Sequence, residues 1–297
     1  MSARFQRVGV LKGGFSAERE VSLRSGAAVA AGLREAGYAV EEVDVQARRL
    51  DLPAGLDAVF VALHGEFGED GEIQALLRSR GMPYTGSGPE ASRASFDKVV
   101  TKKPLEAAGV PVPAYGLARA GEARRLPLPL VVKPPRQGSS LGVTRVLRDE
   151  EWAGALTVAL EFGPEALVEA YIEGAELTVG IVGDEALPVV EIRAPQGLYD
   201  YRAKYTAGLT QYLVPAPLAE DRAAVCRDLA LRTFRALGCE GFARVDLRMD
   251  AQGRCFVLEL NNIPGFTETS LLPKAARAAG IPFPALCDRI LRLASVH

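Results

Sequence analysis

The chain has 297 residues, of which 48% are hydrophobic and 24% are charged, and its formal net charge is −2. This composition is typical of a globular protein, and the length allows two or three domains. The balanced charge provides no general basic field for nucleic acid, and no apolar run reaches the roughly eighteen residues that span a bilayer. We therefore expect neither nucleic acid nor a membrane as a partner.

The N-terminal residues pass directly into a βαβ pattern. They lack the apolar core and cleavage site of a signal peptide, so we expect a cytoplasmic protein. Three strands are predicted, at 6–11, 39–45 and 57–63. Ser16 can cap a helix over about 17–36, and a helix over 71–80 with a short strand at 83–85 completes the unit. The pattern predicts an N-terminal α/β domain of roughly ninety residues.

The second part has the pattern of a small α+β unit. A helical segment over 90–108 leads to the Pro-rich stretch GVPVPAYG, which indicates a boundary. The elements that follow are strands at 129–133, 143–147, 165–171 and 176–182, a Gly/Ser loop at 137–142 and a helix at 149–160.

The third part contains a long irregular segment, 194–217, between a strand and a helix. Its other predicted elements are a strand at 187–193, a helix at 219–237, a hairpin of strands 242–249 and 254–260, and helices at 270–279 and 283–294. Long connections inside compact domains are usually lids or binding loops. With four tyrosines and Lys204, this segment is predicted to close over a phosphorylated substrate.

The hairpin in the third part carries oxygen-bearing side chains. Asp246 lies on its first strand, and Glu259 and Asn261 share one face of the second. Magnesium takes carboxylate and amide oxygens and keeps positions open for water or phosphate, so the hairpin predicts a magnesium site. A solvated hairpin face with acids placed by chance is the alternative at this point.

The Gly/Ser loop allows two interpretations. GSSLG at 138–142 matches the GxSxG motif with Ser140 as a nucleophile, but that motif needs a following helix and a histidine. Here a strand follows, and the only downstream histidine is His297. We therefore favour a phosphate-covering hairpin, in which Ser139 and Ser140 donate hydrogen bonds and Lys133 supplies charge.

Two glutamates lie near the hydrophobic segment that follows the loop. Glu169 and Glu176 flank residues that can form an adenine slot, and a carboxylate accepts hydrogen bonds from a ribose hydroxyl or the adenine amino group. Ordinary exposed glutamates are the alternative.

Seven segments together resemble the D-alanine:D-alanine ligase family of the ATP-grasp superfamily, in order and over essentially the whole chain. They are GGFSAEREVSLRSG (13–26), HGEFGEDGEIQ (64–74), YTGSG with FDK (84–88 and 96–98), VVKPPRQGSSLGV (131–143), YDYRAKYTAGLTQY (199–212), ARVD (243–246) and ELNNIPGFTETS (259–270). The family more often has Thr at Asn262 and Glu at Gln137.

The resemblance implies a fold of α/β and α+β class, the three-domain ATP-grasp architecture with an N-terminal βαβ domain. The implied domains are an N-terminal substrate-binding domain (1–93), a central ATP-grasp domain (94–183) and a C-terminal ATP-grasp domain (184–297) with the lid (194–217) and metal site. The implied activity joins two D-alanines with ATP for peptidoglycan precursor synthesis. It also implies two Mg²⁺ ions, with Mn²⁺ as a substitute, K⁺ as a candidate activator, and a homodimer formed through the N-terminal domain.

Residue roles implied by the resemblance fall into three groups. Nucleotide-binding residues would be Lys98, Lys133, Ser139, Ser140, Glu169, Glu176 and Lys204. Metal ligands would be Asp246, Glu259 and Asn261. Catalytic and substrate-binding residues would be Glu18, linked through Ser139 to Tyr205, together with His64, Arg244, Gly265, Ser270 and Leu271.

Some of these roles have structural alternatives. Arg244 could be only an ion-pair partner, His64 a turn-packing residue, and Ser270 the N-cap of the last helices.

Tyr205 with Lys204 favours D-alanine over D-lactate as the second substrate. The competing functions are a depsipeptide (D-alanine:D-lactate) or other amino-acid ligase and a nucleotide-binding module without catalysis.

Overall fold

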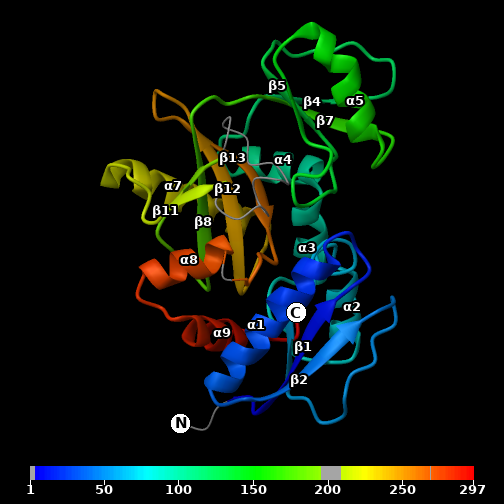
Figure 1. Ribbon diagram of the computed structural model, residues 1–297, viewed down its shortest axis with the longest axis vertical. Coiled ribbons are helices and arrows are strands. Elements are labelled where there is room, and N and C mark those ends of the chain that lie inside the picture. Colours follow the sequence, from blue (N-terminus) through cyan, green and yellow to red (C-terminus); the bar gives the residue numbers. More distant parts are fainter. Residues whose placement is uncertain (1–3, 195–208, 268) are drawn as a thin grey trace.

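The computed structural model describes residues 4–194, 209–267 and 269–297. Its strands form one parallel and two antiparallel sheets. Figure 1 shows the N-terminal sheet at one end of the long axis, the four-stranded sheet at the other and the six-stranded sheet between them. Among the described residues, no helix combines the length and apolar character needed to cross a membrane.

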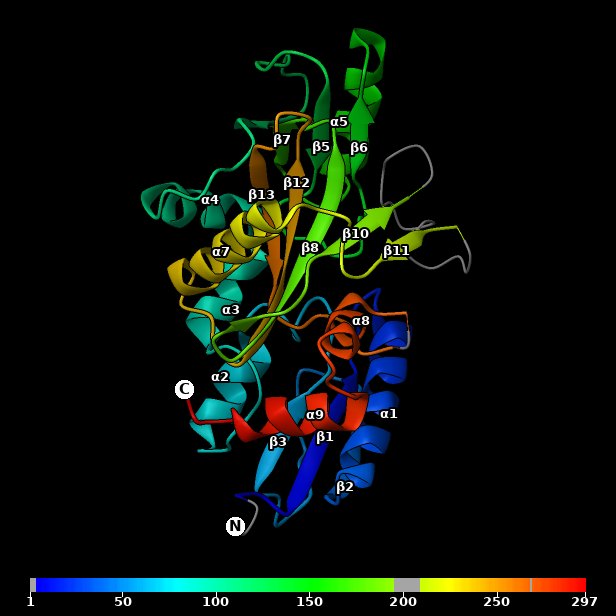
Figure 2. The same ribbon diagram turned by 90° about the vertical axis from the view of Figure 1, so that its left-hand side faces the viewer.

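The N-terminal sheet is parallel, with the order β2-β1-β3. Its strands are β1 (Arg7–Gly13), β2 (Ala39–Val45) and β3 (Ala58–Val61). Every residue of β3 is buried, as expected for a parallel strand covered on both faces. Helix α1 (Arg19–Glu35) lies beside α9 (Phe283–Arg292), so the C-terminal helix completes the N-terminal core (Figure 2). Helix α2 (Glu72–Ser79) follows the sheet.

The start of α1 differs from the prediction. The helix begins at Arg19, and Ser16 lies before it. The Ser16 hydroxyl donates to the carbonyl of His64 at 2.7 Å and accepts from the amide of Glu18 at 3.2 Å. Ser16 therefore holds the loop before α1 against the loop after β3, and does not cap the helix.

The predicted helix over 90–108 is two helices, α3 (Pro89–Phe96) and α4 (Lys98–Ala107). Asp97 separates them with an extended backbone, and its carboxylate accepts the amide of Val99 at 3.0 Å. An aspartate in this position is a strong N-cap, so a new helix starts at Lys98.

The four-stranded sheet is antiparallel, with the order β4-β7-β5-β6. Its strands are β4 (Tyr115–Ala118), β5 (Leu130–Lys133), β6 (Thr144–Val146) and β7 (Ala166–Ala170), and a single 3-10 turn (Asp149–Glu151) leads into α5 (Trp152–Leu160). Leu156 and Ala159 of α5 belong to the same buried core as Val132 of β5. Strand β4 was not predicted from the sequence, because it is only four residues long and follows two prolines.

The six-stranded sheet is antiparallel, with the order β11-β10-β8-β12-β13 and with β9 on the edge of β8. Its strands are β8 (Ala175–Val182), β9 (Glu185–Ala186), β10 (Val190–Arg193), β11 (Gln211–Leu213), β12 (Phe242–Met249) and β13 (Cys255–Asn261). Helix α7 (Glu220–Ala236) covers one face and α8 (Leu271–Ala278) the other (Figure 2). A Cβ at Gly180 would lie 2.6 Å from Leu272 of α8, so glycine allows this close approach.

One strand lies outside the predicted grouping. We placed the strand at 176–182 in the second part of the chain, but β8 pairs with β10 and β12 of the third. Such pairing between distant segments depends on which faces are buried and leaves no local mark in the sequence. The domain boundaries at 93/94 and 183/184 stay predictions.

Candidate active site

The hairpin of β12 and β13 gathers four of the predicted site residues. Arg244 pairs with Asn261 and Asp246 with Glu259, so all four side chains leave the same face of the sheet. Two guanidinium nitrogens of Arg244 donate to the two carboxylate oxygens of Asp246, each at 2.9 Å. The Asn261 amide donates to Asp246 at 3.0 Å. A register shift directly after Asp246 interrupts the regular pairing at the site, and the strands pair again from Leu247 and Val257 onward.

The donor set of the hairpin suits a hard cation. Asp246 and Glu259 provide carboxylate oxygens and Asn261 an amide oxygen, the ligand types of magnesium. Within the described ranges, no three His, Cys, Asp or Glu side chains cluster in a way that could hold a metal, so the amide would have to be a ligand. Lys98 Nζ lies 3.1 Å from Glu259, and Arg244 pairs with Asp246. Both carboxylates have cationic partners in the structure, and the fit to the predicted magnesium site rests on the three oxygen donors that share one sheet face.

Three buried side chains form an ion cluster between α4 and the four-stranded sheet. Lys133, at the end of β5, places its Nζ 2.6 Å from one oxygen of Glu169 on β7. Lys102 of α4 contacts the other oxygen. Burial opposes the charge of Glu169, but the two lysines outweigh it and lower its pKa. Glu169 is therefore a buried carboxylate, and not the exposed glutamate that the sequence left open.

The sequence did not point to Lys102, although one signal was available. Lys98 and Lys102 are four residues apart on α4, so they share a helix face. Both are buried, and two buried lysines on one face require anionic partners. Burial lowers the pKa of Lys102, although the negative charge of Glu169 opposes this change. For Lys133 the balance is reversed, because the charges of Glu169 and Glu259 outweigh burial and raise its pKa.

The second predicted adenosine ligand also has a cationic partner. Glu176 on β8 lies directly opposite Arg248 on β12, and Arg248 donates to it at 2.6 Å. Arg248 also donates to the hydroxyl of Tyr171 at 2.9 Å. The sequence did not single out Arg248, because its partner is more than seventy residues away.

The Gly/Ser loop is the connection of an antiparallel hairpin, since β5 and β6 pair on either side of it. This arrangement agrees with the phosphate-covering interpretation and lacks the helix that a GxSxG nucleophile needs. Ser139 and Ser140 have φ of 51° and 58°, the left-handed region that residues with a Cβ rarely adopt. The Ser139 hydroxyl donates to Glu18, and Lys98 donates to the carbonyl of Gln137 at 2.8 Å. The predicted Glu18–Ser139 contact is therefore present.

The Glu18 carboxylate lies close to the loop backbone as well. A Cβ at Gly138 would lie 2.7 Å from Glu18, and one at Gly65 would lie 3.1 Å from it. Glycine at both positions lets two loops approach the same carboxylate.

His64 is buried between the N-terminal sheet and the loop after β13. Its Nε2 lies 3.1 Å from the hydroxyl of Ser25, and its Nδ1 lies 3.1 Å from the carbonyl of Ile263. Burial lowers the pKa of His64 below its ordinary value, although the charge of Glu18 opposes this change. The imidazole is therefore neutral near pH 7 and joins two parts of the chain.

The depressed pKa of His64 predicts a pH dependence of stability. The unfolded chain takes up a proton near pH 6.5, whereas the folded chain does so only at lower pH. Stability should therefore fall as the pH drops below about 6.5, by at most about 1.4 kcal/mol per pH unit from this group. Urea unfolding of wild type and His64→Gln between pH 8 and 5 measures the effect. The variant should lose less stability than wild type over this range, and equal losses would contradict the assignment.

Glu69 is a site residue that sequence reasoning missed. It lies in the motif HGEFGEDGEIQ, and its carboxylate accepts the amide of Gly65 at 2.9 Å. Burial and the nearby charge of Glu18 raise its pKa well above the ordinary value. Glu69 is therefore held toward its neutral form, so the charge of Glu18 is the one available to pair with an ammonium group.

The loop between β13 and α8 contains the remaining predicted residues. Ser270 occupies the N-cap position of α8, but its hydroxyl makes no capping bond to the helix. Instead it accepts the amide of Thr267 at 2.9 Å. A Cβ at Gly265 would lie 2.8 Å from that hydroxyl, so the Gly265 backbone lies directly against Ser270, with Leu271 next in the chain. The interpretation of Ser270 as only an N-cap is therefore not supported.

Two predicted residues, Lys204 and Tyr205, lie outside the described residues, as does most of the lid segment. At its described end, β11 pairs with β10 through Leu213 and Glu191.

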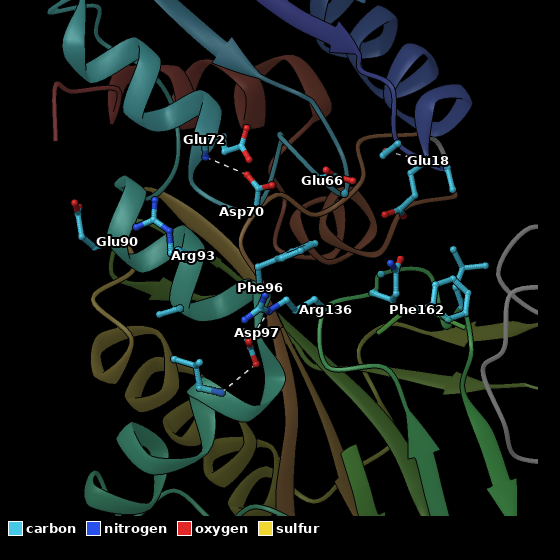
Figure 3. Close-up of a pocket in the computed structure, with 18 residues that line it drawn as sticks. Glu18, Glu66, Asp70, Glu72, Glu90, Arg93, Phe96, Asp97, Arg136 and Phe162 are labelled. Carbon is cyan, nitrogen blue, oxygen red and sulfur yellow. Dashed lines mark hydrogen bonds and ion pairs between the residues drawn. The ribbon is translucent and has the colours of Figure 1, made fainter. Parts of the chain in front are cut away.

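A cavity of about 900 Å³ opens between α3, the loop after β3 and the Gly/Ser loop, with Glu18 on its wall (Figure 3). Acidic side chains predominate over basic ones among its charged lining residues, which are Glu18, Glu66, Asp70, Glu72, Glu90, Arg93, Asp97 and Arg136. An acidic entrance favours the approach of an ammonium group.

Together, the Gly/Ser hairpin with its buried lysines and the oxygen-donor hairpin on a second antiparallel sheet define the class of ATP-grasp enzymes. A sequence model described as the D-ala D-ala ligase C-terminus matches residues 108–292, and one described as the D-ala D-ala ligase N-terminus matches 41–87. The chain therefore belongs to the D-alanine–D-alanine ligase family, as its motifs predicted.

Similar proteins extend over nearly the whole chain. The D-alanine–D-alanine ligase of Desulforudis audaxviator is 49% identical over 97% of this chain and 98% of that protein. The one from Pelotomaculum thermopropionicum is 46% identical over 97% and 96%. A crystal structure of D-alanine–D-alanine ligase from Bacillus anthracis complexed with ATP has a TM-score of 0.85 and 32% identity, and the match covers 97% of each chain. The predicted ATP-grasp fold class is confirmed.

Proposed function

We propose that this protein joins two D-alanine molecules into D-alanyl-D-alanine, with hydrolysis of ATP to ADP and phosphate, for peptidoglycan precursor synthesis. The observation that carries the proposal is the common face of the β12–β13 hairpin. It places Arg244 beside Asp246, Glu259 and Asn261, and Lys98 of α4 reaches the same face. A guanidinium, a lysine and oxygen donors together suit an ATP-driven acyl transfer.

The nucleotide would lie between the two antiparallel sheets. In our proposal Lys98 and Lys133 contact its phosphates, and the Gly/Ser hairpin covers them with Ser139 and Ser140. Glu169 and Glu176 would accept hydrogen bonds from the adenosine. Both carboxylates are held by buried cations in the structure, which supports an acceptor role because an ionised carboxylate only accepts hydrogen bonds.

The metal ligands in this proposal are Asp246, Glu259 and Asn261. Bound magnesium ions would neutralise charge on the phosphoryl oxygens. The protein's own contribution is to fix these three side chains on one sheet face and to keep Lys98 and Arg244 beside them.

In the first half-reaction, the carboxylate of the first D-alanine attacks the γ-phosphorus of ATP. ADP leaves, and an acyl phosphate forms on the substrate. Glu18 would hold the ammonium of this D-alanine, and the Glu18–Ser139 contact brings the ammonium site next to the Gly/Ser hairpin. The same contact would orient the substrate toward the nucleotide.

In the second half-reaction, the amine of the second D-alanine attacks the acyl carbonyl, and phosphate leaves. Arg244 and the backbone amide of Gly265 would stabilise the tetrahedral oxyanion. Ser270 and Leu271 would bind the carboxylate of the second D-alanine, with His64 near it. The Ser270 hydroxyl lies against Gly265 and makes no helix-capping bond, which supports this placement.

The test is phosphate release from ATP and magnesium with D-alanine, L-alanine, or D-alanine plus D-lactate, with products identified by mass. D-alanine-dependent phosphate together with D-alanyl-D-alanine is the expected result. Phosphate release that requires D-lactate, or an amino acid other than D-alanine, would identify a different ligase of the same class. ATP binding without any phosphate release would indicate a nucleotide-binding module.

A homodimer, activation by K⁺ and a cytoplasmic location stay predictions.

A further inference from the structure

Glu169 is shared by two buried lysines, and only one of them has a role in the proposed function. Lys133 and Lys102 each contact a different oxygen of its carboxylate. Lys102 has 1% of its side chain exposed and Glu169 has 3%. Lys102 is more deeply buried than Lys133, which has 8% of its side chain exposed, so we take Lys102 to act through its neighbours and not on the nucleotide itself.

The cluster carries one positive charge in excess, and it still does when the nearby pair of Lys98 and Glu259 is included. Two lysines face one carboxylate, and on the other side of Lys102 lies the ring of Tyr115, 5.5 Å from its Nζ. A buried excess charge is costly unless an anion compensates it. Phosphate groups of a nucleotide are the anions that the site is proposed to bind, and Lys133 is the lysine that would contact them.

We propose that Lys102 is a positioning residue that retains Glu169 when Lys133 exchanges this carboxylate for a nucleotide phosphate. This inference rests on the proposed function, because it takes Lys133 as a phosphate ligand and Glu169 as an adenosine ligand. It assigns a role to a lysine that the proposed chemistry does not otherwise use.

The physical reason is the cost of an unpaired buried charge. In the structure Lys133 lies 2.6 Å from Glu169, so a move toward phosphate weakens that ion pair. Without Lys102, the move would leave a buried carboxylate with no counter-charge, which is strongly unfavourable. With Lys102 present, Glu169 stays ionised and in place, able to accept hydrogen bonds from the adenosine.

A similar arrangement holds the other proposed adenosine ligand. Glu176 is paired with Arg248, which Tyr171 and the carbonyl of Ile172 fix in turn. Each of the two carboxylates thus has a buried cation that is separate from the phosphate-binding lysines.

The experiment compares the binding of ATP and of adenosine, both with magnesium and without D-alanine, by titration calorimetry. Lys102→Met keeps the length of the side chain and removes its charge. ATP should bind this variant about 10- to 100-fold more weakly than wild type, because Lys133 stays with Glu169. Adenosine has no phosphate, so its affinity should change less than threefold or so on the same argument. Lys103→Met, which alters an exposed lysine next to Lys102, is the matched control and should change neither affinity.

A second comparison removes the dependence on one variant. In Glu169→Gln there is no carboxylate to retain, so the added Lys102→Met change should cost less than about threefold in ATP affinity. A tenfold further loss in the double variant, or equal losses of ATP and adenosine binding in Lys102→Met, would overturn the inference. The wild-type assay for dipeptide formation is separate, so failure of the proposed ligase activity is distinguishable from failure of this role.

Discussion

Replacement of Arg244 by alanine is expected to lower the rate of dipeptide formation by about 10²–10³, the usual cost of one lost oxyanion donor. The affinity for ATP should change little, because the proposed phosphate and adenosine ligands are other residues. Arg244 lies on the same sheet face as the proposed metal ligands and is largely buried, so water cannot easily replace it. Steady-state turnover and ATP titration on the same preparation measure the two effects.

The ion pair of Arg244 with Asp246 makes a second measurement necessary. The alanine variant also removes the cation beside a proposed metal ligand, so its magnesium requirement has to be determined. An unchanged magnesium requirement with a low rate supports the oxyanion role. A rate that recovers fully at high magnesium would instead assign Arg244 to the metal site, and a near-normal rate would remove it from the mechanism. Arg254→Ala, an exposed arginine at the turn of the same hairpin, is the control.

Local patterns in the sequence were enough to predict the hairpin that carries the site. Alternation along the strand puts Glu259 and Asn261 on one face, as predicted. The register set by the turn AQG would place Asp246 opposite Leu258, and the register shift between Asp246 and Leu247 brings it opposite Glu259 instead. No pattern in the sequence predicted that shift. The β5–β6 hairpin was predictable in the same way, since a Gly/Ser loop joins two short strands.

The residues that sequence reasoning missed have partners far away in the chain. Lys102 meets Glu169 across 67 residues, and Arg248 meets Glu176 across 72. Propensity and periodicity describe only neighbours along the chain, so they cannot show that a lysine on a helix faces a carboxylate on another element. The grouping of the strand at 176–182 with the second part of the chain, although β8 pairs with β12, has the same cause.

The break between α3 and α4 is different, because a local signal for it existed. Asp97 precedes Lys98, and an aspartate directly before a run of helix formers is a typical N-cap. The continuous hydrophobic and polar pattern from 90 to 108 outweighed that signal in our prediction. The break has a consequence for the site, since it starts α4 at Lys98, whose Nζ reaches both Glu259 and the Gly/Ser loop.

Glu18→Gln is expected to raise the KM for D-alanine by about a hundredfold, because it removes the charge that would pair with the substrate ammonium. Glutamine is close to glutamate in shape and can still accept a hydrogen bond from the Ser139 hydroxyl, so the contact with the Gly/Ser hairpin should persist. ATP affinity should therefore stay close to that of wild type. KM values for D-alanine and ATP, measured separately, test both statements.

Two further variants separate the ammonium role of Glu18 from its contact with the loop. Ser139→Ala removes the hydroxyl that donates to Glu18 but leaves the carboxylate, so its KM for D-alanine should rise much less. Glu20→Gln alters an exposed acid two residues away and should have no effect. If Ser139→Ala and Glu18→Gln raise this KM equally, the important feature is the loop contact. A charge role requires that Glu18→Gln be several times worse, since only this change removes the negative charge of Glu18 from the cavity wall.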